Sequence, residues 1–364
     1  MINPLSEARD LMLEIHALAN LGQQCSDIHI EQDEPMMLKL PRGWQAATSV
    51  PVRLGEMRAL LDTIDEDWED KIVERAIDRL ITLGDCRLRC NVFRAGRGRK
   101  VCISMRCLPV NPLPLDQTGL PSYVRTMLEA TRGIILVTGP TGSGKTTTIA
   151  AMLDYLNSTR KSHIVTIEQP VEYEFGRKQG IISQKEVPVD TETFASGLLE
   201  GLRQKPDVLM VGEIRDQDTA ETLLHAGESG HLVLASMHTN SAVSALTRLL
   251  AFFPAEQRER HAGALAGALV GVVCQGLVPS EDGRAFMLAS EMLFNHNGQL
   301  AQFIGDPSKH HMIAEFMRRQ DDNMSRSLND VLATMVGKRQ ISARDAMRAA
   351  YNRMELHDLL NSQR

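Results

Sequence analysis

The chain has 364 residues, a formal net charge of -6 and an aromatic content of only 4%. Its length exceeds the roughly 250 to 300 residues at which a single hydrophobic core stops growing, so we expect two or three domains. The negative charge argues against a protein that coats nucleic acid. Residues 1–9 are mixed polar and lack the basic and apolar regions of a secretory signal, which favours an intracellular protein.

The cysteines do not have the spacing of a structural zinc site, which usually combines two close pairs. Two are isolated, and the others contain no Cys-x-x-Cys pair: Cys25 and Cys274, then Cys86, Cys90, Cys102 and Cys107. We therefore predict reduced, buried thiols on strands and no bound zinc.

Residues 1–108 predict a small mixed α/β domain. Apolar residues at helical spacing indicate helices, and alternation of apolar and polar residues indicates strands. By these criteria we expect helices at 5–21, 54–64 and 68–83, and strands at 26–30, 36–40, 85–93 and 101–107. The last two strands would form a hairpin with a basic tip.

The strand expected at 85–93 has one face rich in arginine. Side chains alternate along a strand, so one face would carry Arg87, Arg89, Asn91 and Phe93, and the other Leu88, Cys90 and Val92. A solvated face, an arginine that reaches a triphosphate across a subunit boundary, and nucleic-acid binding by the basic tip are the alternatives. The acidic balance of the chain and the lack of interleaved aromatic residues disfavour nucleic acid.

Three prolines within residues 109–114 favour an extended linker, which we place at 109–118. A core domain would follow at 119–285 and a C-terminal helical region at 286–364.

In the core domain, strands are expected at 134–137, 163–167, 208–211 and 230–239, and helices at 123–130, 147–153 and 194–203. In the C-terminal region, helices are expected at 330–336 and 343–360, and the pair His310-His311, which has no nearby third metal ligand, is expected at the surface.

The most specific pattern in the chain is the segment between the first core strand and the next helix. Its residues are Gly139, Pro140, Thr141, Gly142, Ser143, Gly144, Lys145, Thr146 and Thr147. Such glycines let the backbone curl so that its N–H groups point at an anion, and the helix N-terminus adds partial positive charge. Lys145 would reach the β- and γ-phosphates of a nucleotide, and Thr146 would bind Mg²⁺. The pattern predicts a nucleoside triphosphatase.

Acidic residues follow the second and third core strands. Strands that alternate with helices form a parallel sheet, and ligands bind outside the carboxyl ends of its strands. Glu168 and Glu213 should therefore converge on the nucleotide. Because Gly212 stands where a magnesium-binding aspartate is usual, Glu213 is left to activate water, and Glu168 or Glu172 could supply the missing negative charge.

The fourth core strand is framed by His231 and His238. At the end of a parallel strand, His238 could sense the γ-phosphate of a bound nucleotide. A histidine with a structural hydrogen bond is the alternative.

Residues 262–274 contain no charged or polar side chain and carry glycines at 263, 267 and 271. The segment is too short for a membrane-spanning helix, which needs about 20 residues. We expect a helix that is buried in the core or at a subunit contact. If Gly267 touches a neighbouring element, Gly267→Leu should lower stability or assembly by overpacking.

Together these motifs resemble the secretion ATPase family that powers type IV pili and type II secretion, and most closely its pilus-retraction branch of PilT and PilU. Residues 26–30 are similar to the N-terminal strand signature of the family. Residues 139–146 resemble its Walker A motif, 166–173 its Asp box, 202–216 its Walker B motif and 227–239 its His box.

The resemblance implies an α/β fold with a small PAS-like N-terminal domain, a RecA-like ATPase domain with a parallel sheet, and C-terminal helices. It implies ATP and Mg²⁺ as cofactors and a homo-hexamer in the cytoplasm, peripheral at the inner membrane. Its implied partners are an inner-membrane platform protein of a pilus or secretion machine and a paralogous ATPase, and nucleic acid is not expected.

The resemblance also implies roles for individual residues. Glu213 would orient the attacking water, and Glu168 would assist at the magnesium ion. Two histidines would contact the γ-phosphate and two arginines would act on the nucleotide from the N-terminal domain: His231 and His238, and Arg87 and Arg106.

Gln169 departs from the family pattern because it stands where aspartate is usual. The cysteine pairs and the long N-terminal extension of many assembly ATPases are absent, which favours retraction. We therefore expect a hexameric motor that couples ATP hydrolysis to retraction of a type IV pilus. The alternatives are the motor of a DotB-like or conjugative secretion system, and a weakly hydrolysing regulatory subunit, for which Gln169 is the best indication.

Overall fold

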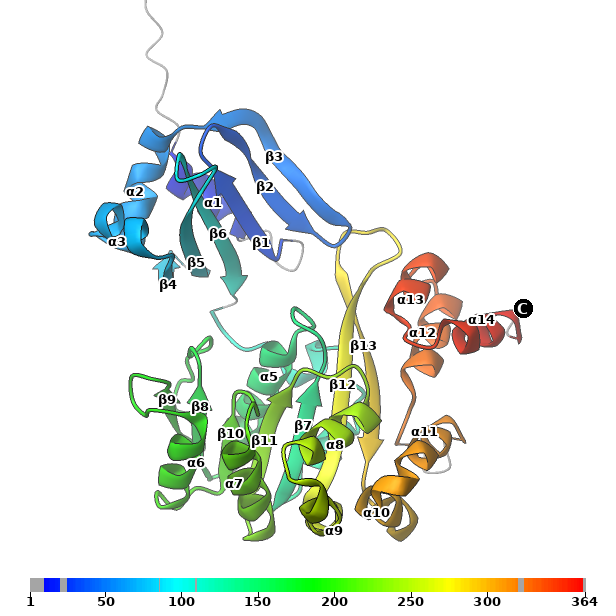
Figure 1. The fold of residues 1–364 in the computed structure, drawn as a ribbon. Helices are drawn as coiled ribbons and strands as arrows, with labels where there is room; N and C mark the ends of the chain where they lie inside the picture. Colours follow the sequence, from blue (N-terminus) through cyan, green and yellow to red (C-terminus); the bar gives the residue numbers. More distant parts are fainter. Residues whose placement is uncertain (1–9, 20–24, 85, 109, 320–323, 363–364) are drawn as a thin grey trace, which may run out of the picture. The chain divides into compact units, whose positions relative to one another are not determined.

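The computed structural model describes residues 10–19, 25–84, 86–108, 110–319 and 324–362. The chain folds as two compact units (Figure 1). The N-terminal unit is Met1–Val110 with Asp282–Phe286, and the core unit is Asn111–Glu281 with Met287–Arg364. The domain boundaries inferred from the sequence stay predictions.

The N-terminal unit is built on an antiparallel sheet with the strand order β3-β2-β1-β6-β5-β4. Leu88, Cys90 and Val92 are fully buried on one face of β5, as the alternation of that strand requires. The helices of this unit pack on the same hydrophobic cluster. The elements are α1 (Leu11–Ala19), β1 (Asp27–Glu31), β2 (Glu34–Leu40), β3 (Gly43–Val52), α2 (Leu54–Ile64), α3 (Trp68–Glu74), β4 (Ile77–Leu83), β5 (Cys86–Ala95) and β6 (Lys100–Leu108).

The helix expected at 68–83 is wrong in its second half. Helix α3 ends at Glu74, and β4 follows and pairs with β5 along its whole length. Ile77 and Ile81, four positions apart on β4, are buried in the same hydrophobic cluster as Leu88, so sheet pairing overrides the helical spacing that the charged residues suggested. The first expected helix is present as α1, and residues 5–9, 20 and 21 of that prediction lie outside the described residues.

The core unit contains a seven-stranded sheet with the order β13-β12-β7-β11-β10-β8-β9. Every pairing from β12 to β9 is parallel, which confirms the predicted parallel sheet. Its strands are β7 (Gly133–Thr138), β8 (His163–Glu168), β9 (Ile181–Glu186), β10 (Val208–Val211), β11 (Leu232–Met237), β12 (Leu269–Pro279) and β13 (Phe286–Phe294).

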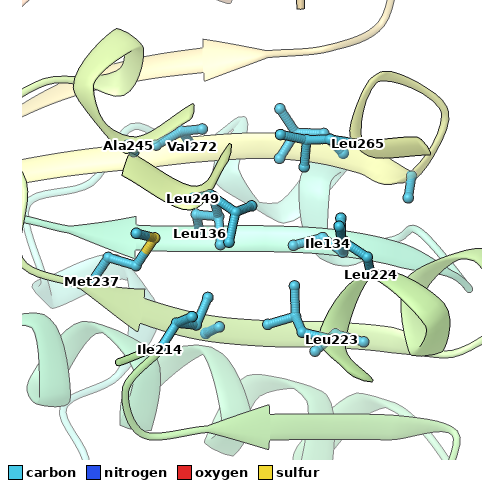
Figure 2. Close-up of a cluster of buried hydrophobic side chains, with 14 of the residues drawn as sticks. Ile134, Leu136, Ile214, Leu223, Leu224, Met237, Ala245, Leu249, Leu265 and Val272 are labelled. Atoms are coloured by element: carbon cyan, nitrogen blue, oxygen red, sulfur yellow. The ribbon is translucent and has the colours of Figure 1, made fainter. Parts of the chain in front are cut away.

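Helices cover both faces of this sheet, so its central strands are apolar on both sides. Ile135 and Val137 of β7 pack with one set of helices, and Ile134 and Leu136 pack with another. Figure 2 shows Ile134 and Leu136 in the second cluster with side chains of α7, α8 and α9. The first set is α4 (Val124–Leu128) and α5 (Lys145–Thr159), and the second includes α6 (Phe194–Leu202), α7 (Gln217–Glu228), α8 (Ala242–Ala251) and α9 (Arg258–Ala268).

The apolar segment 262–274 is not one helix. Helix α9 ends at Ala268, and β12 begins at Leu269 and pairs with β7, because the valines of this stretch suit a buried strand. A Cβ on Gly267 would meet nothing within 4 Å, so the expected contact of Gly267 is wrong within this chain. A Cβ on Gly271 would overlap the Met127 side chain and the Leu293 carbonyl, so Gly271 is the close approach.

The C-terminal region begins with strand β13 and continues as α10 (Gly298–Gly305), α11 (His310–Arg319), α12 (Leu328–Gly337), α13 (Ala343–Ala349) and α14 (Arg353–Ser362). The helix expected at 343–360 is therefore two helices, separated where Ala350 has extended backbone. His310 is buried with its ring nitrogen 3.1 Å from the Ile304 carbonyl, so the expected surface position is wrong for His310 and confirmed for His311.

Three short 3-10 helices complete the described elements, at Leu115–Gln117, Ala255–Gln257 and Pro307–Lys309. Among the described residues, the helices lack the combination of length and apolar character that a membrane span requires. All six cysteines are free thiols, and five are buried as predicted, but Cys107 is half-buried and Cys25 precedes β1 instead of lying on a strand. The absence of zinc stays a prediction.

Candidate functional site

The glycine-rich loop joins the end of β7 to the first residue of α5. Gly139, Gly142 and Gly144 have φ angles of 148°, 78° and 83°, which glycine adopts at little cost. A Cβ on Gly139 would overlap the Gln275 carbonyl and the Ser143 side chain. The loop therefore needs these glycines to curl tightly in front of α5, whose first N–H groups have no partner within the helix.

Lys145 has its ammonium group inside the curl of the loop. Its Nζ donates to the Gly139 carbonyl at 2.9 Å and the Pro140 carbonyl at 3.1 Å, and lies 3.3 Å from Nδ1 of His238. Burial lowers the pKa of Lys145, while the nearby Glu213 acts in the opposite direction. A partly desolvated ammonium among curled backbone groups provides a site for an anion such as a phosphate.

Gln275 of β12 forms a hydrogen bond to the phosphate loop. It is not among the site residues predicted from the sequence. The side chain is buried, and its Nε2 donates to the Ser143 carbonyl at 2.7 Å. The parallel register pairs Cys274 with Thr138, so Gln275 lies beside Gly139. The available signal was a polar residue directly after an apolar run, similar to the signal for Glu213, which follows its apolar run after one glycine.

Glu213 lies just beyond the end of β10 and makes contacts with both carboxylate oxygens. Its Oε2 accepts from Arg215 Nε at 2.8 Å and lies 2.7 Å from Nη2 of the same side chain. Its Oε1 lies 3.4 Å from Nε2 of His238. Because His238 also lies within 3.3 Å of Lys145, the imidazole joins Glu213 to the loop lysine.

The two histidines that frame β11 lie at opposite ends of the strand. Met237 pairs with Thr138, the last residue before the loop, so His238 follows at the carboxyl edge of the sheet. Leu232 pairs with Gly133 at the other edge, where Nδ1 of His231 lies 3.2 Å from Ser229 Oγ. The structure therefore brings His238 to Lys145 and does not bring His231 there.

Glu168 is the last residue of β8 and is buried. Its Oε1 accepts from Thr166 Oγ1 at 2.6 Å and from Gln184 Nε2 at 3.0 Å, and burial raises the pKa of the carboxyl group. Gln184 also donates to the Tyr173 carbonyl at 2.8 Å, and the Tyr173 hydroxyl lies 3.1 Å from Thr147 Oγ1. A continuous set of hydrogen bonds thus connects Glu168 to the first turn of α5.

Arg87 and Arg106 belong to the sheet of the N-terminal unit. Arg87 is buried on β5, and Nε of Arg106 on β6 donates to the Asp27 carboxylate at 3.2 Å. Arg106 pairs in register with Arg89, whose Nη2 donates to Asp78 at 2.9 Å. Arg89 and Arg106 are thus paired with carboxylates of their own unit, whereas Arg87 is buried, so the arginine-rich face is not uniformly solvated.

The residues at the carboxyl edge of the core sheet provide the groups that phosphoryl transfer to water requires. The loop and Lys145 offer positive charge, the exposed Thr146 offers a hydroxyl group, and Glu213 offers a carboxylate within contact of His238. Catalysis of this kind depends on positioning and electrostatic stabilisation. The edge combines binding groups for a nucleoside triphosphate with a group that can orient water.

Comparisons with known proteins agree with this chemistry. A family model described as "Type II/IV secretion system protein" matches residues 70–353. The type IV pilus retraction ATPase PilT of Pseudomonas aeruginosa is 36% identical over 259 residues, which are 70% of this chain and 75% of that protein.

Two solved structures are similar over nearly the whole chain. The crystal structure of the pilus retraction motor PilT with bound ADP has a TM-score of 0.79 at 33% identity and covers 96% of this chain and 99% of its own. The ATPase DotB of Legionella pneumophila has a TM-score of 0.82 at 26% identity, with 93% of each chain covered. The chain belongs to the type II/IV secretion system protein family and is an ATPase of that family.

Proposed function

We propose that the chain is a hexameric motor that couples ATP hydrolysis to retraction of a type IV pilus. The similarity to PilT over most of both chains supports this function. The observation that carries the catalytic part is the convergence of Lys145, His238 and Glu213 at one edge of the sheet, joined by contacts of 3.3 and 3.4 Å.

The nucleotide would bind at the curled loop, with residues 139–147 surrounding its phosphates. Lys145 would exchange its loop carbonyls for the β- and γ-phosphates, which are better partners for an ammonium group. His238 would turn from Lys145 toward the γ-phosphate and report whether it is present. Glu213 would then hold the attacking water through Oε1, the oxygen that faces His238 in this structure.

The residues present also fit a magnesium ion. Mg²⁺ prefers oxygen ligands and keeps several waters, and the exposed hydroxyl of Thr146 lies at the first turn of α5. Glu168 is connected to the neighbouring Thr147 through Gln184 and Tyr173, so its carboxylate would assist at the ion. When bound, Mg²⁺ would neutralise charge on the phosphates.

Two arginines of the N-terminal unit complete the proposed machinery. Arg87 or Arg106 would reach the nucleotide of a neighbouring subunit and absorb charge in the transition state, which in related phosphate-loop enzymes is worth about 10³ to 10⁵ in rate. Motion of the N-terminal unit would be passed to an inner-membrane platform protein. The motor would work in the cytoplasm, peripheral at that membrane, with a paralogous ATPase as a further partner.

Steady-state ATP hydrolysis with Mg²⁺ tests the catalytic assignment, with each protein sized in parallel. We expect the parent to turn over, and Lys145→Ala and Glu213→Gln to be inactive while both still form rings with nucleotide. Inactivity of the parent, or full activity of Glu213→Gln, would contradict the assignment.

Deletion of the gene in its host tests the retraction role. We expect surface pili to accumulate and twitching to stop, and the parent, but not Lys145→Ala, to restore movement. Normal retraction in the deletion strain would overturn this role.

The similarity to DotB favours a second candidate, the motor of another secretion system. A deletion strain that retracts its pili normally but fails to export a protein or DNA substrate would support it. A regulatory subunit with little turnover is the third candidate, suggested by Gln169, and it predicts that the parent binds ATP but does not hydrolyse it.

A further inference from the structure

Arg215 makes the closest contacts to the carboxylate of Glu213. Two of its nitrogens, Nε and Nη2, lie 2.8 and 2.7 Å from the same oxygen, Oε2. The other oxygen, Oε1, is the one that faces His238. Because both nitrogens belong to one planar guanidinium, they define the direction of Oε2 and leave Oε1 turned toward the phosphate loop.

The guanidinium of Arg215 is itself held by two further groups. Nη1 donates to the Gln169 side-chain carbonyl at 3.2 Å, and the guanidinium carbon lies 5.8 Å from the centre of the Phe194 ring. The Gln169 side chain thus accepts from Nη1, the guanidinium nitrogen that does not contact Glu213. The Phe194 ring lies near the guanidinium and supports its plane. Of these three groups only Glu213 carries a negative charge.

Gln169 and Glu213 come from different strands. Gln169 follows β8 and Glu213 follows β10, and Gly212 donates its N–H to the Ile167 carbonyl at 2.8 Å. This backbone bond keeps the two strand ends side by side, so Arg215 bridges them. Glu213 is partly accessible, with 19% of its side chain exposed, so the bridge limits rotation of its carboxylate more tightly than the 3.4 Å contact to His238 would alone.

We infer that Arg215 is a positioning residue that orients Glu213 for attack by water, and that Gln169 anchors Arg215 in that orientation. This inference rests on the proposed role of Glu213 in hydrolysis. Gln169 lacks a charge, so it does not compete with Glu213 for the guanidinium. An aspartate at this position would divide the guanidinium between two carboxylates. Under this inference Gln169 is compatible with turnover, which argues against the regulatory-subunit candidate that its lack of charge suggests.

The test compares kcat and nucleotide affinity in Arg215→Gln, Arg215→Lys and the control Arg177→Gln, an exposed arginine of the core unit outside the family motifs. We expect Arg215→Gln to lower kcat by about 10- to 100-fold, as displacement of a reacting group does. Affinity for a fluorescent ATP analogue should change by less than about threefold. Arg215→Lys should recover part of kcat, because it keeps the positive charge but loses the planar guanidinium that contacts Glu213 through two nitrogens.

A double-mutant cycle tests the part played by Gln169. Gln169→Leu should lower kcat about two- to tenfold in the parent and have no further effect in Arg215→Gln, because contacting residues are not additive. Equal effects in both backgrounds would overturn the anchoring role. A parent-like kcat in Arg215→Gln, or equal losses of kcat and affinity, would overturn the positioning role.

The same measurements separate this inference from the proposed function. If Glu213→Gln still hydrolyses ATP, the proposed role of Glu213 fails. If Glu213→Gln is inactive while Arg215→Gln keeps the parent kcat, the inference about Arg215 fails and the proposed function stands.

Discussion

The parallel strands of the core sheet carry different chemistry at their two ends, the carboxyl edge and the amino edge of the sheet. The carboxyl edge gathers Lys145, His238 and Glu213, which are joined by contacts of 3.3 and 3.4 Å. The amino edge, about 20 Å away along a six-residue strand, carries His231. It also has a cavity of about 470 Å³ whose lining includes Gly133, Gly227 and Gly267.

Strand direction, more than residue type, decides which side chains lie beside the phosphate loop. Both edges have glycines and a histidine. At the carboxyl edge a loop and a helix N-terminus follow β7, so unpaired N–H groups meet the side chains. At the amino edge, Gly133 and Gly227 allow close packing, because a Cβ on either would overlap a neighbouring residue, and no such loop follows them. Substitutions at the carboxyl edge should therefore lower the rate of hydrolysis, and substitutions at the amino edge should not.

Removal of the loop lysine should have the largest effect. Lys145→Ala removes the ammonium group that would contact the phosphates, so we expect hydrolysis to fall by at least about 100-fold. A charge change at the amino edge, Arg132→Ala, is the matched control and should leave the rate within about twofold. Similar losses in both variants, measured by phosphate release, would break the distinction between the edges.

The histidines at the two ends of β11 give a sharper comparison. His238→Gln should lower the hydrolysis rate about tenfold or more, because the imidazole contacts both Lys145 and Glu213. His231→Gln makes the same chemical change at the amino edge and should leave the rate near that of the parent. A larger loss for His231→Gln would show that this residue reaches a nucleotide outside its own chain.

Two glycines near the amino edge should differ in stability. Gly271→Ala should lower the free energy of unfolding by about 1 to 3 kcal/mol, since its Cβ would overlap Met127 and the Leu293 carbonyl. Gly267→Ala should be neutral or stabilise α9 by up to about 1 kcal/mol, because its Cβ would meet open space. Chemical denaturation checks both values, and loss of stability in Gly267→Ala would indicate an unrecognised contact.

Glu291 should give the smallest effect, a dependence of stability on pH. It is buried, its carboxylate accepts from the N–H groups of Ala242 and Leu328 and from the Tyr351 hydroxyl, and burial raises its pKa. A raised folded-state pKa means that its stabilising contribution is complete below pH 4.5, the ordinary value, and decreases as pH rises through the folded value.

We therefore expect the stability of the parent relative to Glu291→Gln to decrease as pH rises above 4.5. Denaturation of both proteins across this range measures the difference. A difference that grows with pH would show that the ionised carboxylate stabilises its helix N-termini more than burial disfavours it.

The local sequence pattern was sufficient to predict those elements whose structure depends on neighbouring residues. The phosphate loop, strand β8, strand β10 that precedes Glu213, and helix α6 were all predicted near their observed positions. The helix expected at 343–360 is interrupted at Ala350, and the errors of element type lie where a helix meets a strand without a strong turn signal, at 68–83 and at 262–274. There, sheet pairing decides between helix and strand, and pairing partners are distant in sequence.

The sequence by itself determined the family, the nucleotide loop and the acidic residue that follows β10, because each depends on residue types at short spacing. The tertiary structure alone decided that His238 meets Lys145 while His231 does not, that Gln275 supports the loop, and that Gln169 and Arg215 touch. The physical reason is that strand order and direction set these contacts, and both arise from pairing of segments far apart in the chain.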